Sequence, residues 1–350
     1  MGSVPREPRD TGDLPSRRVT VRDVARAAGV SQATASRALN GGHRVSPDTH
    51  RRVLRASEEL GWSANVLARG LRTQRSGTVG LVLPGVQNPY FAEVLEALEP
   101  LLAESDRTLL VCTTLNSAAT EARRLESLIS RMVDGLVVVP SGGERSMPAL
   151  LNAAHLVPTV LIDRYVDGCG LDYVGTDNFE GLRLVLRHLA RTGVRTVTYV
   201  GAGTTISTAA DRLAGFRSAA ARRRLTVLQE LSGDFSVEWG KQAAADILSR
   251  AQLPDAIVCD ADVIAIGVLT VLHQRGIAVP DEIQVTGFDD LPVDQSTYPP
   301  LTSVRQAVNE QAAEALRLLD LRAADRGRVA SRSVFSPALV LRESTKEATG

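Results

Sequence analysis

Two hydrogen-bonding side chains, Gln32 and Arg37, lie on one side of a short stretch with helical spacing, residues 31–39. A glutamine amide can bond the edge of adenine, and an arginine guanidinium can bond the edge of guanine. The opposite side is apolar, because small hydrophobic residues recur there at the spacing of a buried stripe: Ala35, Ala38 and Leu39. The chemistry that this pattern predicts is the recognition of bases in a DNA major groove.

The residues before this stretch predict the element that positions it. Thr20 is a good N-cap and Asp23 follows three residues later, close to a capping box, so a helix should begin at residue 21. Gly29 can adopt the left-handed conformation that ends a helix, and Ser31 can cap the next one. Two helices joined by a tight turn indicate a helix-turn-helix. A plain helical hairpin that packs a core fits the periodicity of this stretch equally well.

A third helix and the local charge favour the DNA-binding interpretation. Ser46 and Pro47 are typical of a helix start, and Gly61 of a helix end. Residues 18–75 hold 11 arginines against 4 acidic residues, whereas the whole chain has a net charge of zero. A basic segment beside an acidic remainder indicates a nucleic-acid partner, although a solvated arginine-rich face is the alternative.

Composition excludes several other classes. The chain is 44% hydrophobic and 23% charged, as in ordinary globular proteins. No apolar run reaches the roughly 18 residues of a membrane span. Residues 1–17 are charged and rich in proline, so we expect a disordered extension and not a secretory signal. The three cysteines and five histidines are scattered, which favours a reducing compartment and predicts no metal site and no cofactor.

From Gly77 onward, short apolar strands alternate with amphipathic helices. The first unit contains expected strands at 78–84, 108–114, 134–140 and 158–163, and expected helices at 91–103 and 120–132. The pattern restarts after Val174. Alternation of this kind predicts two doubly wound α/β units with parallel sheets, and ligands bind such sheets at the carboxyl ends of the strands.

Three stretches carry a specific resemblance: DVARAAGVSQATASRALN at 23–40, VSPDTHRRVLRASEELGW at 45–62 and NVLARGL at 65–71. They resemble the headpiece and hinge of the LacI/GalR (lactose-repressor) family of bacterial transcription regulators, and the resemblance continues to about Leu341.

The resemblance implies a helix-turn-helix headpiece at 18–62, a hinge helix at 63–76 and an effector-binding core at 77–345. The core would consist of two subdomains of the periplasmic-binding-protein type. The N subdomain would span 77–174 and 304–330, and the C subdomain 175–303 and 331–345, with chain crossings near Val174, Ser303 and Ala330.

The resemblance also implies the residues that bind DNA. Gln32, Ala33 and Arg37 match positions that read base edges. Positions that contact phosphates, and so set the register, are matched by Thr20, Ser31, Thr34, Ser36, Asn40 and Arg44.

In the hinge, Leu71 matches the residue that wedges into a central base step of the minor groove, with Ala68 beside it, although Leu71 could be a plain core leucine. The hinge departs from the family pattern at Ala64, where proline is frequent, and at Gly70, where serine is common. We therefore expect it to become helical only on DNA.

A further set of residues matches the effector cleft of the family: Asn88, Tyr90, Phe91, Asp163, Arg164, Asp177, Arg212, Phe235, Asp262 and Asp289. Carboxylates, an arginine fork and aromatic rings suit a polyhydroxylated ligand, such as a sugar. We expect Arg212 to bind two ligand oxygens, with Asp289 across the cleft. Arg212 could instead lie on a helix surface, and Asp262 or Asp289 could cap a helix. Ala261 stands where the family often has Asn, which weakens the analogy with its usual sugar contacts.

The function that follows from the resemblance is that of an effector-controlled repressor. It would act as a homodimer on a pseudo-palindromic operator in the bacterial cytoplasm, at the nucleoid, without a membrane partner. One alternative is a sugar-metabolising enzyme fused to a DNA-binding domain, but the sequence shows no GxxxxGK[ST] loop and no obvious nucleophile–base pair. A solute-binding protein is the other alternative, and the basic headpiece argues against it.

Overall fold

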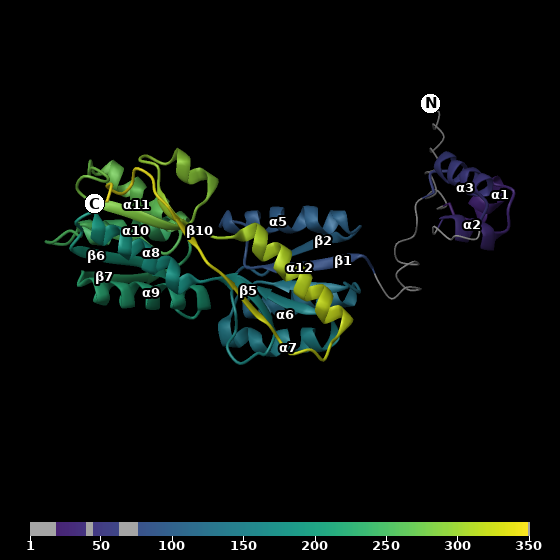
Figure 1. Cartoon of the computed structure of the whole chain (residues 1–350), viewed down its shortest axis with the longest axis horizontal. Coiled ribbons are helices and arrows are strands. Elements are labelled where there is room, and N and C mark those ends of the chain that lie inside the picture. The colour runs from purple at the N-terminus through teal and green to yellow at the C-terminus, as the bar shows by residue number, and fades with distance from the viewer. Residues whose placement is uncertain (1–18, 40–44, 63–75, 349–350) are drawn as a thin grey trace, which may run out of the picture. The chain divides into compact units, whose positions relative to one another are not determined.

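The computed structural model describes residues 19–39, 45–62 and 76–348. The chain divides into two compact units, Met1–Gln74 and Arg75–Gly350. In the described part of the first unit, three helices pack together (Figure 1): α1 (Val21–Ala27), α2 (Gln32–Leu39) and α3 (Pro47–Glu59). The predicted helix-turn-helix is therefore present, with the third helix packed against it.

Side-chain caps start these helices at the expected residues. Thr20 and Asp23 form a capping box at α1, in which the Thr20 amide donates to the Asp23 carboxylate at 3.0 Å. Ser31 Oγ accepts the Thr34 amide at 3.1 Å, and Ser46 caps α3 in the same way. Gly29 has a φ of +64°, the left-handed conformation that the turn between α1 and α2 requires.

Small residues form the core of this unit. Val24, Ala35 and Val53 are completely buried, and Ala56 lies beside them. Because alanines line α2, the helices can approach closely while the other side of α2 remains open to solvent. Leu54 and Leu60, which helical spacing also favours for the inner side of α3, are partly exposed instead.

The second unit holds two six-stranded sheets, each covered by helices (Figure 1). The sheet of the N subdomain has the order β11-β5-β4-β3-β1-β2 and is parallel throughout. Its strands are β1 (Thr78–Leu83), β2 (Thr108–Thr113), β3 (Gly135–Val138), β4 (Thr159–Ile162), β5 (Asp172–Thr176) and β11 (Arg332–Phe335). Its helices are α5 (Tyr90–Glu104), α6 (Ala118–Ser130), η1 (Gly143–Ser146), α7 (Met147–Leu156) and α12 (Val308–Ala324).

The sheet of the C subdomain has the order β12-β10-β9-β8-β6-β7, in which only the edge strand β12 runs antiparallel. Its strands are β6 (Thr196–Ala202), β7 (Thr226–Gly233), β8 (Ala256–Cys259), β9 (Gln284–Asp289), β10 (Thr302–Arg305) and β12 (Ala338–Val340). Its helices are α8 (Asn178–Arg191), α9 (Ser207–Arg223), α10 (Val237–Leu248), α11 (Asp262–Gln274) and η2 (Pro292–Ser296). The predicted pair of doubly wound units is confirmed, and α7 is a helix that the sequence pattern did not indicate.

The chain crosses between the subdomains slightly later than expected. The crossings fall between β5 and α8, between β10 and α12, and between β11 and β12. The boundary near Ala330 was wrong, because residues 332–335 pair with β5 in the N subdomain. Buried Asp172 fixes this arrangement: its carboxylate accepts hydrogen bonds from the Ser331 amide, Arg322 and Arg328.

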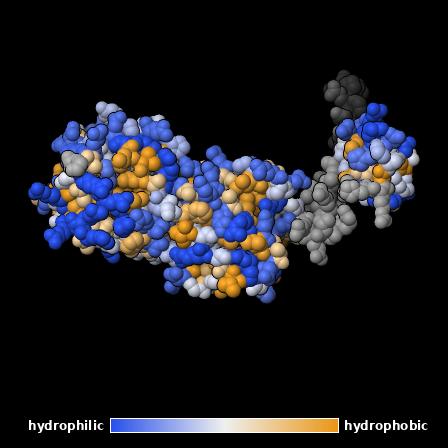
Figure 2. Space-filling model, in the orientation of Figure 1, coloured by the Kyte–Doolittle hydropathy of each residue, from blue (hydrophilic) through white to orange (hydrophobic). Residues whose placement is uncertain are grey.

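The surface of the second unit contains both hydrophilic and apolar residues. Hydrophilic residues cover much of the visible face of both subdomains, with apolar patches between them (Figure 2). Within the described ranges, no helix combines the length and the hydropathy needed to cross a bilayer.

Candidate functional sites: a DNA-reading helix and a charged cleft

The outer side of α2 presents the residues predicted to read bases. Gln32, Ala33 and Arg37 are all exposed, and the Arg37 Nε donates to the carbonyl of Ala33 at 3.1 Å. This bond holds the arginine stem along the helix and leaves the rest of the guanidinium at the surface. The helix thus offers an amide, a methyl group and a guanidinium on one side, which are suitable partners for base edges.

Three of the predicted phosphate-contacting residues lie at the starts of α1 and α2. Ser31 and Thr34 lie at the first turn of α2, where their hydroxyls are 2.8 Å apart, and Thr20 Oγ1 donates to Asp23 at 2.6 Å. Ser36 lies further along α2 and is partly buried. The other predicted DNA contacts lie outside the described residues: Asn40, Arg44, Ala68 and Leu71.

In the second unit, Arg212 lies at the centre of a buried network in the C subdomain. Its Nε donates to Asn178 Oδ1 at 2.7 Å, and its Nη1 donates to the Asp260 carbonyl at 2.5 Å. Its Nη2 lies 3.7 Å from Asp289 Oδ1, and the guanidinium carbon lies 3.6 Å from the centre of the Phe288 ring. Arg212 and Asp289 are 3% and 4% exposed, so neither is a surface residue. They belong to the same subdomain, which corrects the expectation that Asp289 lies across the cleft.

Arg164 is the matching cation of the N subdomain. It follows β4, forms an ion pair with Asp163 at 3.7 Å, and donates from Nη1 to the Pro140 carbonyl. Its guanidinium carbon lies 5.6 Å from the ring of Phe91, which belongs to the N subdomain, and 5.8 Å from the ring of Phe235, which belongs to the C subdomain. Arg164 therefore lies where the two subdomains meet, between two aromatic rings.

Burial dominates the electrostatics of this cleft. It raises the pKa of Asp289 well above the ordinary range, against the opposing effect of Arg212. It likewise raises the pKa of Asp163, and that of Asp260 to about 6. Of the buried side-chain atoms without a hydrogen-bond partner among the described residues, three belong to residues around this cleft: Tyr90 Oη, Arg164 Nε and Asp260 Oδ1. Buried polar groups are normally paired, so these atoms leave unused hydrogen-bonding capacity at the cleft.

The remaining predicted cleft residues form local structural bonds. Asn88 Oδ1 accepts the Tyr90 amide, and Asp177 caps α8 by accepting the Glu180 amide. Asp262 accepts the Leu291 amide and the Ser303 hydroxyl, one on each carboxylate oxygen. These residues position the loops around the cleft, and their contact with a ligand stays a prediction.

Three participating residues were missed by the sequence analysis: Asn178, Asp260 and Gln306. Gln306 donates to Asp289 at 2.8 Å and accepts a bond from Thr176 at 2.6 Å, so it connects two of the chain crossings to the cleft. Asn178 directly follows Asp177, and Asp260 directly follows β8. Their position just after strands was the sequence signal that could have identified them as cleft residues.

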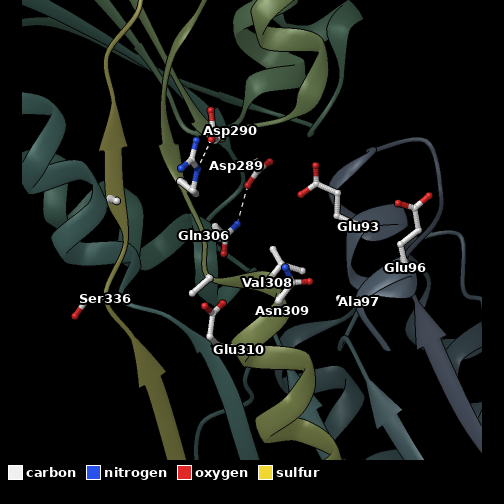
Figure 3. A pocket seen from close by; sticks show the side chains of 13 residues that line it. Glu93, Glu96, Ala97, Asp289, Asp290, Gln306, Val308, Asn309, Glu310 and Ser336 are labelled. Atoms are coloured by element: carbon white, nitrogen blue, oxygen red, sulfur yellow. Dashed lines mark hydrogen bonds and ion pairs between the residues drawn. The ribbon is translucent and has the colours of Figure 1, made fainter. Parts of the chain in front are cut away.

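A groove of about 610 Å³ lies beside Asp289 (Figure 3). Glu93 and Glu96 of α5 form one side, and Asp290 lies on the other, where it pairs with Arg305 and Arg342. Figure 3 shows Glu93 facing Asp289 and Asp290. Burial, helped by Asp262, Asp290 and Glu96, raises the pKa of Glu93 to about 7.

Comparisons with known proteins agree with the two-part architecture. The profile of bacterial regulatory proteins of the lacI family matches residues 20–65, and that of the periplasmic binding protein-like domain matches residues 186–345. The HTH-type transcriptional repressor PurR of Mannheimia succiniciproducens is 31% identical over 330 residues, which cover 94% of this chain and 99% of that protein.

Two solved structures extend the comparison. The complex of the transcriptional regulator CelR with cellobiose is 30% identical, with a TM-score of 0.71, and covers 93% of this chain and 100% of that one. The lac repressor dimer bound to operator and the anti-inducer ONPF has a TM-score of 0.86 at 24% identity, and covers 94% of this chain and 99% of that one.

A helix-turn-helix unit followed by a two-subdomain core with a charged cleft defines a ligand-responsive DNA-binding regulator. The chain belongs to the LacI family of bacterial transcriptional regulators. It is a transcriptional repressor with a periplasmic-binding-protein-like effector domain, and not an enzyme fused to a DNA-binding domain.

The raised pKa of Glu93 predicts a pH-dependent stability. Because the folded protein holds this proton more tightly than the unfolded chain does, the stability that it contributes is present below about pH 4 and is lost as the pH rises through 7. Glu93→Gln removes this loss. Relative to the parent, the free energy of unfolding of the variant should increase by about 1–2 kcal/mol as the pH rises from 5 to 8, after discounting for solvent screening.

Urea denaturation of both proteins at the two pH values measures this gain. Glu99→Gln is the matched control, because Glu99 lies on the exposed side of the same helix. A Glu93→Gln variant whose stability relative to the parent is the same at pH 5 and pH 8 would contradict the assignment.

Proposed function

We propose that this repressor binds a pseudo-palindromic operator as a homodimer and responds to a polyhydroxylated small molecule, a sugar, in the cleft between its subdomains. It would act on DNA in the bacterial cytoplasm. The observation that carries the proposal is the pair of buried arginines, Arg164 and Arg212, each held by a carboxylate and an aromatic ring at the place where the subdomains meet.

The chemistry of the cleft favours hydroxyl groups. A sugar hydroxyl can accept from a guanidinium and donate to a carboxylate, so it can bond both members of the Arg212–Asp289 pair. The apolar C–H face of a sugar ring can pack on Phe91 or Phe235. The complex of CelR with cellobiose, at 30% identity, supports the same class of ligand.

The origin of these residues explains how a ligand would regulate the protein. Phe91, Asp163 and Arg164 come from the N subdomain, and Arg212 and Asp289 from the C subdomain. A ligand that bonds both sets favours one relative orientation of the subdomains, by as much as its differential affinity. The hinge connects the N subdomain to the headpiece, so this preference would reach the DNA-binding unit.

The DNA interface that we propose consists of the residues predicted from the family. Gln32, Ala33 and Arg37 would read bases from the exposed side of α2. Phosphate contacts would come from Thr20, Ser31, Thr34, Ser36, Asn40 and Arg44, and minor-groove contacts from Ala68 and Leu71. One headpiece reads only a half-site, so two copies are needed for a palindrome. The lac repressor structure is that of a dimer on its operator.

Replacement of Arg37 by alanine tests the DNA interface. Loss of a bidentate contact to a base should weaken binding to the preferred site by about 10–100-fold, with a smaller effect on random duplex. The preferred site is obtained by selection from a random DNA pool, and anisotropy titrations measure both affinities. Arg55→Ala, an exposed arginine of α3, is the control. Equal losses on the selected site and on random DNA would show that Arg37 contacts only phosphates.

The dimer is tested by light scattering of the full chain at micromolar concentration, with and without the selected duplex. The expected protein mass is about twice the 37.4 kDa of one chain. A monomeric mass in the presence of DNA would refute the homodimer.

Replacement of Arg212 tests the effector site. A thermal-shift screen of mono- and disaccharides, with cellobiose included, first identifies a stabilising sugar. Arg212→Ala should keep operator affinity within a few-fold and lose the sugar response, because the guanidinium fork is gone. Arg212→Lys should also respond poorly while it retains the buried charge. Arg217→Ala, an exposed residue of the same helix, is the control. A variant that responds at the same sugar concentration would remove Arg212 from the site.

A further inference from the structure

A second set of contacts joins the subdomains beside the two cleft arginines. Tyr165, in the loop after β4 of the N subdomain, donates from its hydroxyl to both carboxylate oxygens of Asp211 on α9, at 3.0 and 3.1 Å. Its backbone amide donates to Ser207 Oγ on the same helix, at 3.0 Å. We call Tyr165, Ser207 and Asp211 the clasp.

The N subdomain holds the phenol ring of Tyr165 in place. The guanidinium carbon of Arg332, on β11, lies 4.1 Å from the centre of the Tyr165 ring and 4.9 Å from that of Tyr173. The two tyrosine rings meet edge to face, with centroids 5.3 Å apart. The hydroxyl is therefore presented to the C subdomain from a fixed platform of two rings and a cation.

The subdomains also touch at the neighbouring backbone. Gly143, of η1 in the N subdomain, lies so near the loop before α9 that a Cβ atom on it would be 2.5 Å from the carbonyl oxygen of Thr205. Such a close approach is possible only where the residue has no side chain. The clasp therefore lies in a region where the two subdomains are in direct contact.

The position of the clasp in the sequence gives it a role. Tyr165 directly follows Arg164, and Asp211 directly precedes Arg212. We propose that Tyr165 and Asp211 are positioning residues, which hold the two cleft arginines in register across the subdomains and favour the arrangement of the subdomains described here. This inference rests on the proposed function, in which those arginines bind the effector. In the described part of the chain, the hydrogen bonds of the clasp join Tyr165 to α9 and do not include Arg164 or Arg212.

Amide hydrogen exchange of the full-length, ligand-free protein tests the clasp directly. The Tyr165 amide is bonded across the subdomains, so its exchange reports opening. Tyr165→Phe keeps the ring stack and removes the hydroxyl, which bonds a charged acceptor. Exchange in peptides covering 163–167 and 203–212 should become about tenfold faster. Peptides covering β8 should be unchanged, and the melting temperature should shift little.

Three further proteins complete the experiment. Asp211→Ala should have the same effect as Tyr165→Phe, and the double variant should add nothing, as expected when two residues act through one bond. Tyr298→Phe, at a tyrosine that is 79% exposed, is the control and should match the parent. Unchanged exchange in Tyr165→Phe would overturn the proposal. Faster exchange throughout the chain with a lower melting temperature would also overturn it, because it would show a purely structural role.

No ligand takes part in this measurement. A failed sugar screen would therefore contradict the proposed effector and leave the exchange result unaffected. Unchanged exchange would contradict the clasp and leave the proposed effector unaffected.

Discussion

The burial of two guanidinium groups is the constraint on which the core of this repressor depends. An unpaired charge in a protein interior is strongly unfavourable, so each arginine needs fixed partners. Arg212 receives an amide oxygen, a backbone carbonyl and the Asp289 carboxylate, and Arg164 receives Asp163 and a backbone carbonyl. These partners come from the carboxyl ends of strands in both sheets and from the segments that connect the subdomains. The doubly wound architecture is what brings so many strand ends to one place.

The headpiece depends on a different constraint, the small size of its core residues. Alanines on α2 let three short helices pack with few atoms, which leaves the other side of α2 free for polar residues. The capping side chains of Thr20, Ser31 and Ser46 stabilise helices that are too short to be stable alone. In this unit, the capping signals and the tertiary structure agree.

Local signals explain which parts could be predicted. The capping box at Thr20, the turn at Gly29 and the alternation of strands and helices are properties of neighbouring residues, and the structure has all of them. The pairing of β11 with β5 depends on Asp172 and arginines about 150 residues away, so the crossing near Ala330 was misplaced. For the same reason, the sequence analysis missed Gln306 and expected Asp289 across the cleft from Arg212. Contacts between distant segments leave no periodic pattern in a sequence.

The internal pairing of the cleft also restricts the ligand. Asp163 pairs with Arg164 and Asp289 with Arg212, so a simple anion would meet a carboxyl group beside either guanidinium. A cation would meet the reverse problem at Arg164 and Arg212. A neutral group that both donates and accepts hydrogen bonds can join either pair without an unbalanced charge. A ligand changes the subdomain equilibrium only through bonds that differ between the two arrangements of the subdomains. In the proposed site, such bonds would come from Tyr90 Oη and Asp260 Oδ1, two buried atoms without a hydrogen-bond partner among the described residues.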